Sequence, residues 1–317
     1  ITRWRLTRSI PVVFTSQANQ KTPTKAYNPF WRNDPLSSPE KSAPTCQSSS
    51  HGGSNENSNN NRIDFYSMNY LELISVKAWA DLKSEANRAY IGFLWWFMEP
   101  ILYMGSFYLL FGLGLKMGGE NFMYFLLCGL LPWKWFSSSL SNGSSSIVAN
   151  AGLINQIYLP KYVLPMVTVT VTSMKFLMVL PILLLFLALS GFTPSIHWTA
   201  LLPIVACQFL LVAAFASLLA AVIPFIPDLR FIIENGMLLL MFLSGVFFDM
   251  TRIDESLRAI FYLNPVAVLL KNYREVLLHN QWPPMFDIFY IAGFAAVAGA
   301  ASWYVLKKID RRVIKVL

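Results

Sequence analysis

A long apolar run constrains the fold of this chain more than any other feature. Between Tyr90 and Leu115 the only formally charged residue is Glu99. The run exceeds the ~20 residues that a helix needs to cross ~30 Å of hydrocarbon, and it follows a charged segment that ends at Arg88. We therefore predict an all-α, polytopic membrane protein in which a polar helix leads into the first membrane span.

The composition agrees with a membrane protein. Of the 317 residues, 55% are hydrophobic, 15% are aromatic and only 13% are charged, which is about half the charged fraction of an average soluble domain. The formal net charge is +8, but many of the basic residues flank apolar runs instead of alternating with aromatic residues on one polar face. This arrangement favours membrane orientation over nucleic-acid binding.

Residues 1–67 differ from the rest of the chain because they are rich in Ser, Asn, Pro and Gln. Such a composition buries too little apolar surface to offset the entropy of ordering, so we predict a disordered leader. The first methionine is Met68, which suggests a native start near that residue. The alternative is a functional disordered tail.

Residues 68–89 are predicted to form an amphipathic helix at the cytoplasmic membrane surface. Leu71, Ile74, Ala78 and Leu82 recur at helical spacing, and Asn69 precedes Glu72 in the manner of a capping box. The polar side carries Glu72, Asp81, Glu85 and Arg88. We expect Trp79 to lie near the lipid headgroups.

Residues 90–307 are predicted to form a six-span transmembrane domain, followed by a basic tail at 308–317. The six apolar segments lie at about 90–115, 122–140, 162–189, 200–223, 231–248 and 286–306. Basic residues gather in the tail and in the amphipathic helix, which places both termini in the cytoplasm and requires an even number of spans. Between the fifth and sixth spans, residues 249–284 are too polar to span and too apolar for a plain loop, so we predict two re-entrant helices separated at Asn264 and Pro265.

Four segments resemble a known family in their order along the chain. They are DLKSEANRAYIGFLWW from Asp81, GLLPWKWFSSSL from Gly129, NQIYLPKYVLP from Asn155 and LNPVAVLLKNYREVLL from Leu263. Together they resemble the membrane permease subunits of ABC exporters for polysaccharides and polyol phosphates, which export O-antigens, capsules and teichoic acids. The resemblance implies a homodimer in the bacterial inner membrane that works with two copies of a separate nucleotide-binding subunit.

The resemblance also implies sites. The loop between the second and third spans would contact the ATPase through Asn155, Gln156, Tyr158, Leu159 and Lys161, and the amphipathic helix would contribute Lys83 and Arg88. The re-entrant helices would lie near an extracellular gate with Asp249, Arg252, Arg258, Asn264 and Pro265. We expect Asp249, Arg252, Arg258, Lys271 and Arg274 to face a water-filled vestibule or to pair among themselves.

Aromatic residues concentrate in the first two predicted spans. Because aromatic faces stack on the apolar C–H faces of sugars, we predict that some of them line a glycan path: Trp95, Trp96, Phe97, Tyr103, Trp133, Trp135 and Phe136. The alternative is interfacial anchoring and packing against lipid. Glu99, Lys134 and Lys175 are ionisable residues inside predicted spans, so we expect them to be functional or paired.

The chain carries no motif for energy-yielding chemistry of its own. It lacks a GxxxxGK[ST] loop, so ATP and Mg are expected on the partner subunit and no cofactor or metal on this chain. The expected cargo is a lipid-linked polymer, and the alternative cargo is a lipophilic drug or a lipid. Two other classes are a membrane-embedded glycolipid-processing enzyme, which the scattered histidines disfavour, and a gradient-driven transporter, for which no convincing internal repeat is present.

Overall fold

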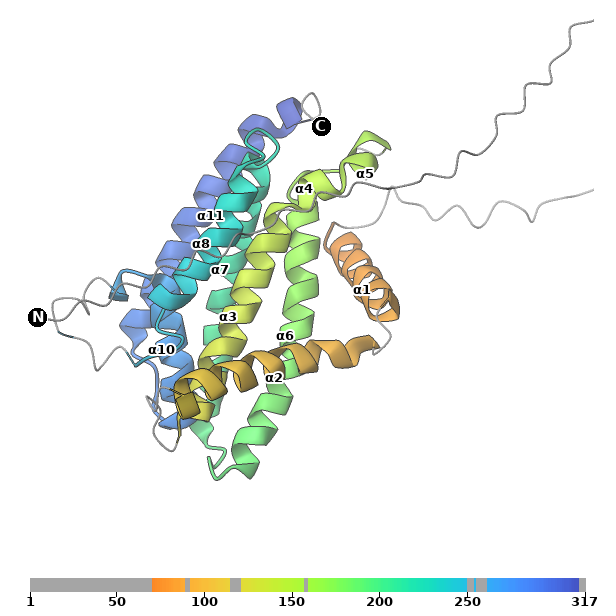
Figure 1. Cartoon of the computed structure of the whole chain (residues 1–317). Coiled ribbons are helices and arrows are strands. Elements are labelled where there is room, and N and C mark those ends of the chain that lie inside the picture. The colour runs from red at the N-terminus through yellow and green to blue at the C-terminus, as the bar shows by residue number, and fades with distance from the viewer. Residues whose placement is uncertain are drawn as a thin grey trace, which may run out of the picture. The chain divides into compact units, whose positions relative to one another are not determined.

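The computed structural model describes residues 70–88, 92–114, 121–156, 159–249, 254 and 261–313. These residues form helices joined by short connections, with no strand among them (Figure 1). The predicted leader lies outside the described residues. The order is α1 (Tyr70–Arg88), η1 (Gly92–Leu94), α2 (Trp95–Phe107), the π-helix η2 (Tyr108–Gly114), α3 (Phe122–Ser144), α4 (Ser146–Ala149), α5 (Ala151–Gln156), α6 (Val163–Leu189), η3 (Ile196–Ala200), α7 (Leu201–Val222), α8 (Leu229–Leu243), α10 (Pro265–Leu278) and α11 (Met285–Val313).

Three of the described helical segments are long and apolar enough to cross a membrane. They are Val163–Leu189, Ile196–Val222 and Met285–Lys308, which correspond to the third, fourth and sixth predicted spans. The second predicted span is the 23-residue helix α3, and the fifth is the 15-residue helix α8. The first is the continuous helical segment 92–114, which runs across α3 and α6 in Figure 1. A total of six spans therefore stays a prediction.

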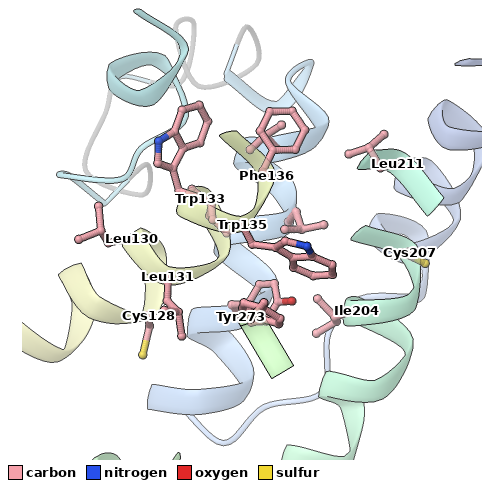
Figure 2. Packing of buried hydrophobic residues seen from close by; sticks show 14 of the residues in the cluster. Cys128, Leu130, Leu131, Trp133, Trp135, Phe136, Ile204, Cys207, Leu211 and Tyr273 are labelled. Carbon is pink, nitrogen blue, oxygen red and sulfur yellow. The ribbon is translucent and has the colours of Figure 1, made fainter. Parts of the chain in front are cut away.

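Helix α3 lies at the centre of the main core. It packs against α2, α6, α7, α8 and α10. Small residues permit the close approach of its C-terminal half to α7, since a Cβ added at Gly143 would lie 2.8 Å from the Cβ of Ala216. Figure 2 shows that Trp133 and Trp135 leave α3 in different directions, with the Trp135 indole toward Tyr273 and Ile204.

Buried polar groups join α3 to its neighbours. The Tyr273 hydroxyl donates to Gln208 Oε1 at 2.8 Å, and Gln208 Nε2 donates to the Pro132 carbonyl at 2.9 Å. The hydroxyls of Ser139 and Thr172 lie 2.6 Å apart between α3 and α6. Such bonds hold apolar helices in one register because the alternative is an unsatisfied polar group away from water.

Helix α1 is amphipathic, as predicted, and lies against α6. Ile74, Ala78 and Leu82 are buried, and they form a small cluster with Val163, Val167 and Val171 of α6. Leu71, which shares the predicted spacing, is 80% exposed and does not belong to this cluster. The placement of α1 at the membrane surface stays a prediction.

Arg274 of α10 is a buried charged residue that needs several hydrogen-bond acceptors. Its side chain donates to the carbonyls of Gly245 and Val246 at 2.8 Å each and to the carbonyl of Phe125 at 3.2 Å. Its guanidinium carbon lies 3.6 Å from the centroid of the Phe125 ring. Asn264 assists by capping α10 through the Val266 N–H and by donating to the Ser244 hydroxyl at 2.9 Å. Arg274 thus joins α3, α10 and the segment after α8.

The space for this arginine comes from Gly129, because a Cβ there would overlap Nη2 of Arg274. We predict that Gly129→Ala destabilises the protein by about 1–3 kcal/mol, which is the usual cost of overpacking a core. The measurement is the midpoint of thermal unfolding in detergent.

The matched control is Gly236→Ala in α8, where an added Cβ has no neighbour within 4 Å. An unchanged midpoint for Gly129→Ala would contradict the tight fit between Gly129 and Arg274.

Candidate functional site: a charged aromatic cavity

Four helices line an open cavity of about 260 Å³. Helix α1 contributes Glu85, and α2, α3 and α6 contribute the remainder of the lining. The aromatic and charged lining residues are Glu85, Trp95, Trp96, Glu99, Lys134, Trp135, Lys175 and Phe176. Aromatic faces beside hydrogen-bonding and charged groups are typical of a site for a polar organic ligand.

Two lysines in this cavity are paired with carboxylates. Lys134 Nζ lies 2.6 Å from Glu99 Oε1, which joins α3 to α2. Lys175 Nζ lies 2.5 Å from Glu85 Oε1 and 2.6 Å from Oε2, which joins α6 to α1. The expectation that Glu99, Lys134 and Lys175 are paired is therefore confirmed. Pairing lowers the free-energy cost of an ionised side chain among apolar helices.

Each lysine also lies over an aromatic ring. Lys134 Nζ is 5.1 Å from the centroid of Tyr103, and Lys175 Nζ is 5.4 Å from that of Trp96. Both distances are within the range of cation–π attraction. Each ammonium group thus has one carboxylate and one ring beside it.

One wall of the cavity is rigid. The Trp135 and Phe176 rings stack with centroids 4.3 Å apart and planes inclined by 15°. The Trp135 indole N–H donates to the Ser173 hydroxyl at 3.2 Å. Because Trp135 is only 4% exposed, it presents a fixed edge to the cavity.

The aromatic residues predicted to line a path fall into two groups. Trp95, Trp96 and Trp135 line the cavity, and Tyr103 lies beside it through Lys134. Trp133 and Phe136 are not among the lining residues and pack within the main core. Phe97 is a half-buried residue of α2. The spacing of the aromatic residues could not distinguish cavity-lining from core residues, because α3 is buried on nearly all sides.

The predicted ATPase-contact residues also differ in where they lie and in how exposed they are. Lys83 and Arg88 are exposed on α1, and Asn155 and Gln156 lie in α5, whereas Tyr158 is outside the described residues. Lys161 is only 3% exposed in a single copy of the chain, and its contact with the ATPase stays a prediction. Leu159 packs against the cluster shared by α1 and α6 instead of standing free.

The predicted gate residues are resolved in part. Asn264 and Pro265 stand at the start of α10, and Asp249 is the last described residue of the segment that follows α8. The two re-entrant helices stay a prediction. Arg252 and Arg258 lie outside the described residues. Arg274 binds backbone carbonyls and also interacts electrostatically with Asp249, as expected within that set. Lys271 instead pairs with Asp287 at 3.2 Å, which lies outside the set.

Sequence reasoning missed Glu85, Thr172 and Phe176 as lining residues. The polar face of α1 was visible in its spacing, but only tertiary packing brings Glu85 to Lys175. No group of acidic, histidine or cysteine side chains in the described part of the chain could hold a metal ion.

The ion pair of Lys134 with Glu99 can be tested by a double-mutant cycle. We expect Lys134→Gln and Glu99→Gln each to lower the unfolding midpoint, and the double variant to lose less than their sum. A coupling energy of about 0.5–1 kcal/mol is expected for a pair that is one-third exposed.

The control cycle uses Arg230 and Glu234, whose side chains are 59% and 48% exposed. Its coupling should be close to zero. Equal couplings in the two cycles would show that the cavity pair is an ordinary surface pair.

Comparisons with known proteins agree with this architecture. Residues 72–278 match the ABC-2 type transporter family. The chain is 29% identical over 246 residues to an O-antigen export system permease protein RfbA of Klebsiella pneumoniae, covering 76% of this chain and 95% of the relative. It is 31% identical over 236 residues to an RfbA permease of Myxococcus xanthus, covering 74% and 90%. The chain therefore belongs to the ABC-2 type transporter family of multi-pass membrane permeases.

Proposed function

We propose that this chain is the permease subunit of an ATP-driven exporter that moves a lipid-linked polysaccharide, such as an O-antigen, across the bacterial inner membrane. The observation that carries the proposal is the similarity over three quarters of the chain to permeases named for O-antigen export. In this proposal two copies of the chain form the path. Two copies of a separate subunit bind ATP and Mg and supply the energy, and both termini of the permease are cytoplasmic.

The cavity supports a role in the cargo path. Trp95 and Trp96 come from α2 and Trp135 from α3, so indole rings from two helices meet at one hollow. Indole faces bind sugar C–H faces with little directional demand, and the paired charges offer hydrogen bonds to hydroxyl groups. Such a surface suits passage of a polymer because no single contact is strong.

A packed route connects the proposed ATPase contact to this cavity. Asn155 and Gln156 end α5, and Leu159 of the same loop between predicted spans packs on the small cluster shared by α1 and α6. Trp96 packs on that cluster from the cavity side. A displacement of the loop would therefore press on α1 and on a cavity wall through direct contacts.

The ATPase partner can be tested by co-purification. We expect Asn155→Arg to abolish recovery of a nucleotide-binding subunit co-expressed with the permease, because a large cation would occupy the proposed contact. The control is Thr193→Arg, an exposed position in the loop after α6, at the opposite end of that helix.

Recovery of the permease alone, even with the candidate ATPase of the same gene cluster co-expressed, would contradict the exporter assignment. Equal losses in both variants would instead indicate general misfolding.

The cargo role predicts that Trp95→Ala lowers polysaccharide export several-fold while ATPase binding persists. Trp95 is 48% exposed, so its removal leaves the core intact. The measurement is surface polysaccharide in cells that depend on this permease, normalised to permease abundance.

Trp303 of α11 serves as the control because it is 65% exposed and is not among the cavity-lining residues. If Trp303→Ala and Trp95→Ala reduce export equally, the cavity has no special part in the cargo path.

A further inference from the structure

An apolar groove runs between α7 and α11, which pack side by side (Figure 1). Its volume is about 500 Å³. The lining residues are glycine or apolar apart from Tyr290, whose hydroxyl already donates to the Leu263 carbonyl at 2.8 Å. None of them lines the charged aromatic cavity, so the groove is separate from the proposed cargo path.

The groove exposes apolar surface that no described part of the chain covers. On α11, Gly293 leaves open space, because an added Cβ would have no neighbour within 4 Å. Phe215 of α7 and Phe294 of α11 form a wall, with ring centroids 6.4 Å apart and planes inclined by 26°. Val297 is 73% exposed. Both helices belong to segments that are long and apolar enough to cross a membrane, so this surface lies at hydrocarbon depth.

The groove is shorter than a membrane span. On α11 it extends from Phe289 to Ala301, which is about 18 Å at a rise of about 1.5 Å per residue. A second spanning helix would extend well beyond it, because such a helix crosses about 30 Å of hydrocarbon. One lipid acyl chain belongs to a single leaflet of about half that thickness. The length of the groove therefore favours an acyl chain over a protein helix as its occupant.

A basic residue continues the groove-lining face of α11. Ala301, Tyr304 and Lys308 follow one another at spacings of three and four residues, so they share one face of the helix. Lys308 Nζ lies 5.8 Å from the centroid of the Tyr304 ring. Tyr304 is 66% exposed, as expected of an aromatic residue at the membrane–water interface, and Lys308 lies one turn beyond it. Lys308 is exposed and has no carboxylate partner in the described part of the chain.

We infer that the groove binds an anionic phospholipid, with an acyl chain along Gly293 and Ala301 and its phosphate at Lys308. Lysine pairs readily with phosphate, and basic residues at the ends of membrane helices attract anionic lipid headgroups. The groove and the cation act together, because an apolar groove alone would accept the chain of any lipid. The inference goes beyond the proposed function, since this lipid is a constituent of the membrane and is held outside the cargo cavity.

The test uses the purified full-length chain in phosphatidylcholine nanodiscs with increasing fractions of phosphatidylglycerol that carries a photoactivatable acyl chain. Mass spectrometry locates the crosslinked peptides. We expect saturable labelling of residues 215–218 and 289–301, and no saturation with a phosphatidylcholine probe of the same chain. Equal labelling by the two probes would show that ordinary bulk lipid covers the groove. Protection of these residues from both probes would show that a second copy of the chain covers it. Either result overturns the inference.

The headgroup contact is tested by Lys308→Gln. We expect the phosphatidylglycerol fraction at half-saturation to rise about fivefold, which is the usual contribution of one basic residue near an anionic membrane surface. Lys83→Gln is the matched control, because it makes the same charge change at an exposed position of α1. An unchanged half-saturation in Lys308→Gln, or an equal rise in both variants, overturns the assignment of the headgroup to Lys308.

The position of the acyl chain is tested by Gly293→Leu. The new side chain would occupy the groove without striking the core, so we expect saturable labelling to be lost while the protein elutes from a sizing column as before. Gly236→Leu in α8 is the matched control, because an added Cβ there also has no neighbour within 4 Å. Saturable labelling that persists in Gly293→Leu, or that is lost equally in both variants, overturns the placement of the lipid in the groove. These measurements need neither an ATPase nor export, so their failure leaves the exporter proposal standing.

Discussion

An ionised side chain among apolar helices must keep a counter-charge or a set of carbonyls, and much of this structure follows from that requirement. Arg274 satisfies it with three backbone carbonyls and an aromatic face, at the junction of α3, α10 and the segment after α8. Lys134 and Lys175 satisfy it with glutamates from neighbouring helices. The first solution is permanent because the carbonyls belong to buried backbone. The second is exchangeable because the carboxylates are partly in water.

The same helix provides the centre of the core and a wall of the cavity. Within four consecutive residues of α3, Trp133 and Phe136 pack in the core, while Lys134 and Trp135 line the cavity. The Trp135 ring is held by Phe176 and Ser173 of α6. A site built on such an element keeps its geometry because its side chains cannot adjust without disturbing the core.

The sequence predicted what depends on local pattern and failed where packing decides. The length of the apolar runs gave α6, α7 and α11, and the spacing of Ile74, Ala78 and Leu82 gave the buried face of α1. Spacing could not show that Leu71 lacks a partner, nor that Lys161 turns inward. The cost of a charge in an apolar span showed that Lys175 needs a partner, but not that Glu85, 90 positions earlier, would be that partner. Only the docking of α1 on α6 brings them together.

The docking of α1 on α6 also predicts that local unfolding of α1 costs less free energy than unfolding of the core. The strip formed by Ile74, Ala78 and Leu82 on three valines of α6 is small beside the core that surrounds α3. Removing α1 exposes this strip and one ion pair, while freeing α3 requires the whole helical assembly to separate. The amide protons of α1 should therefore exchange with solvent through a local opening, and those of α3 only through global unfolding. An opening confined to α1 would leave the packing around α3 intact.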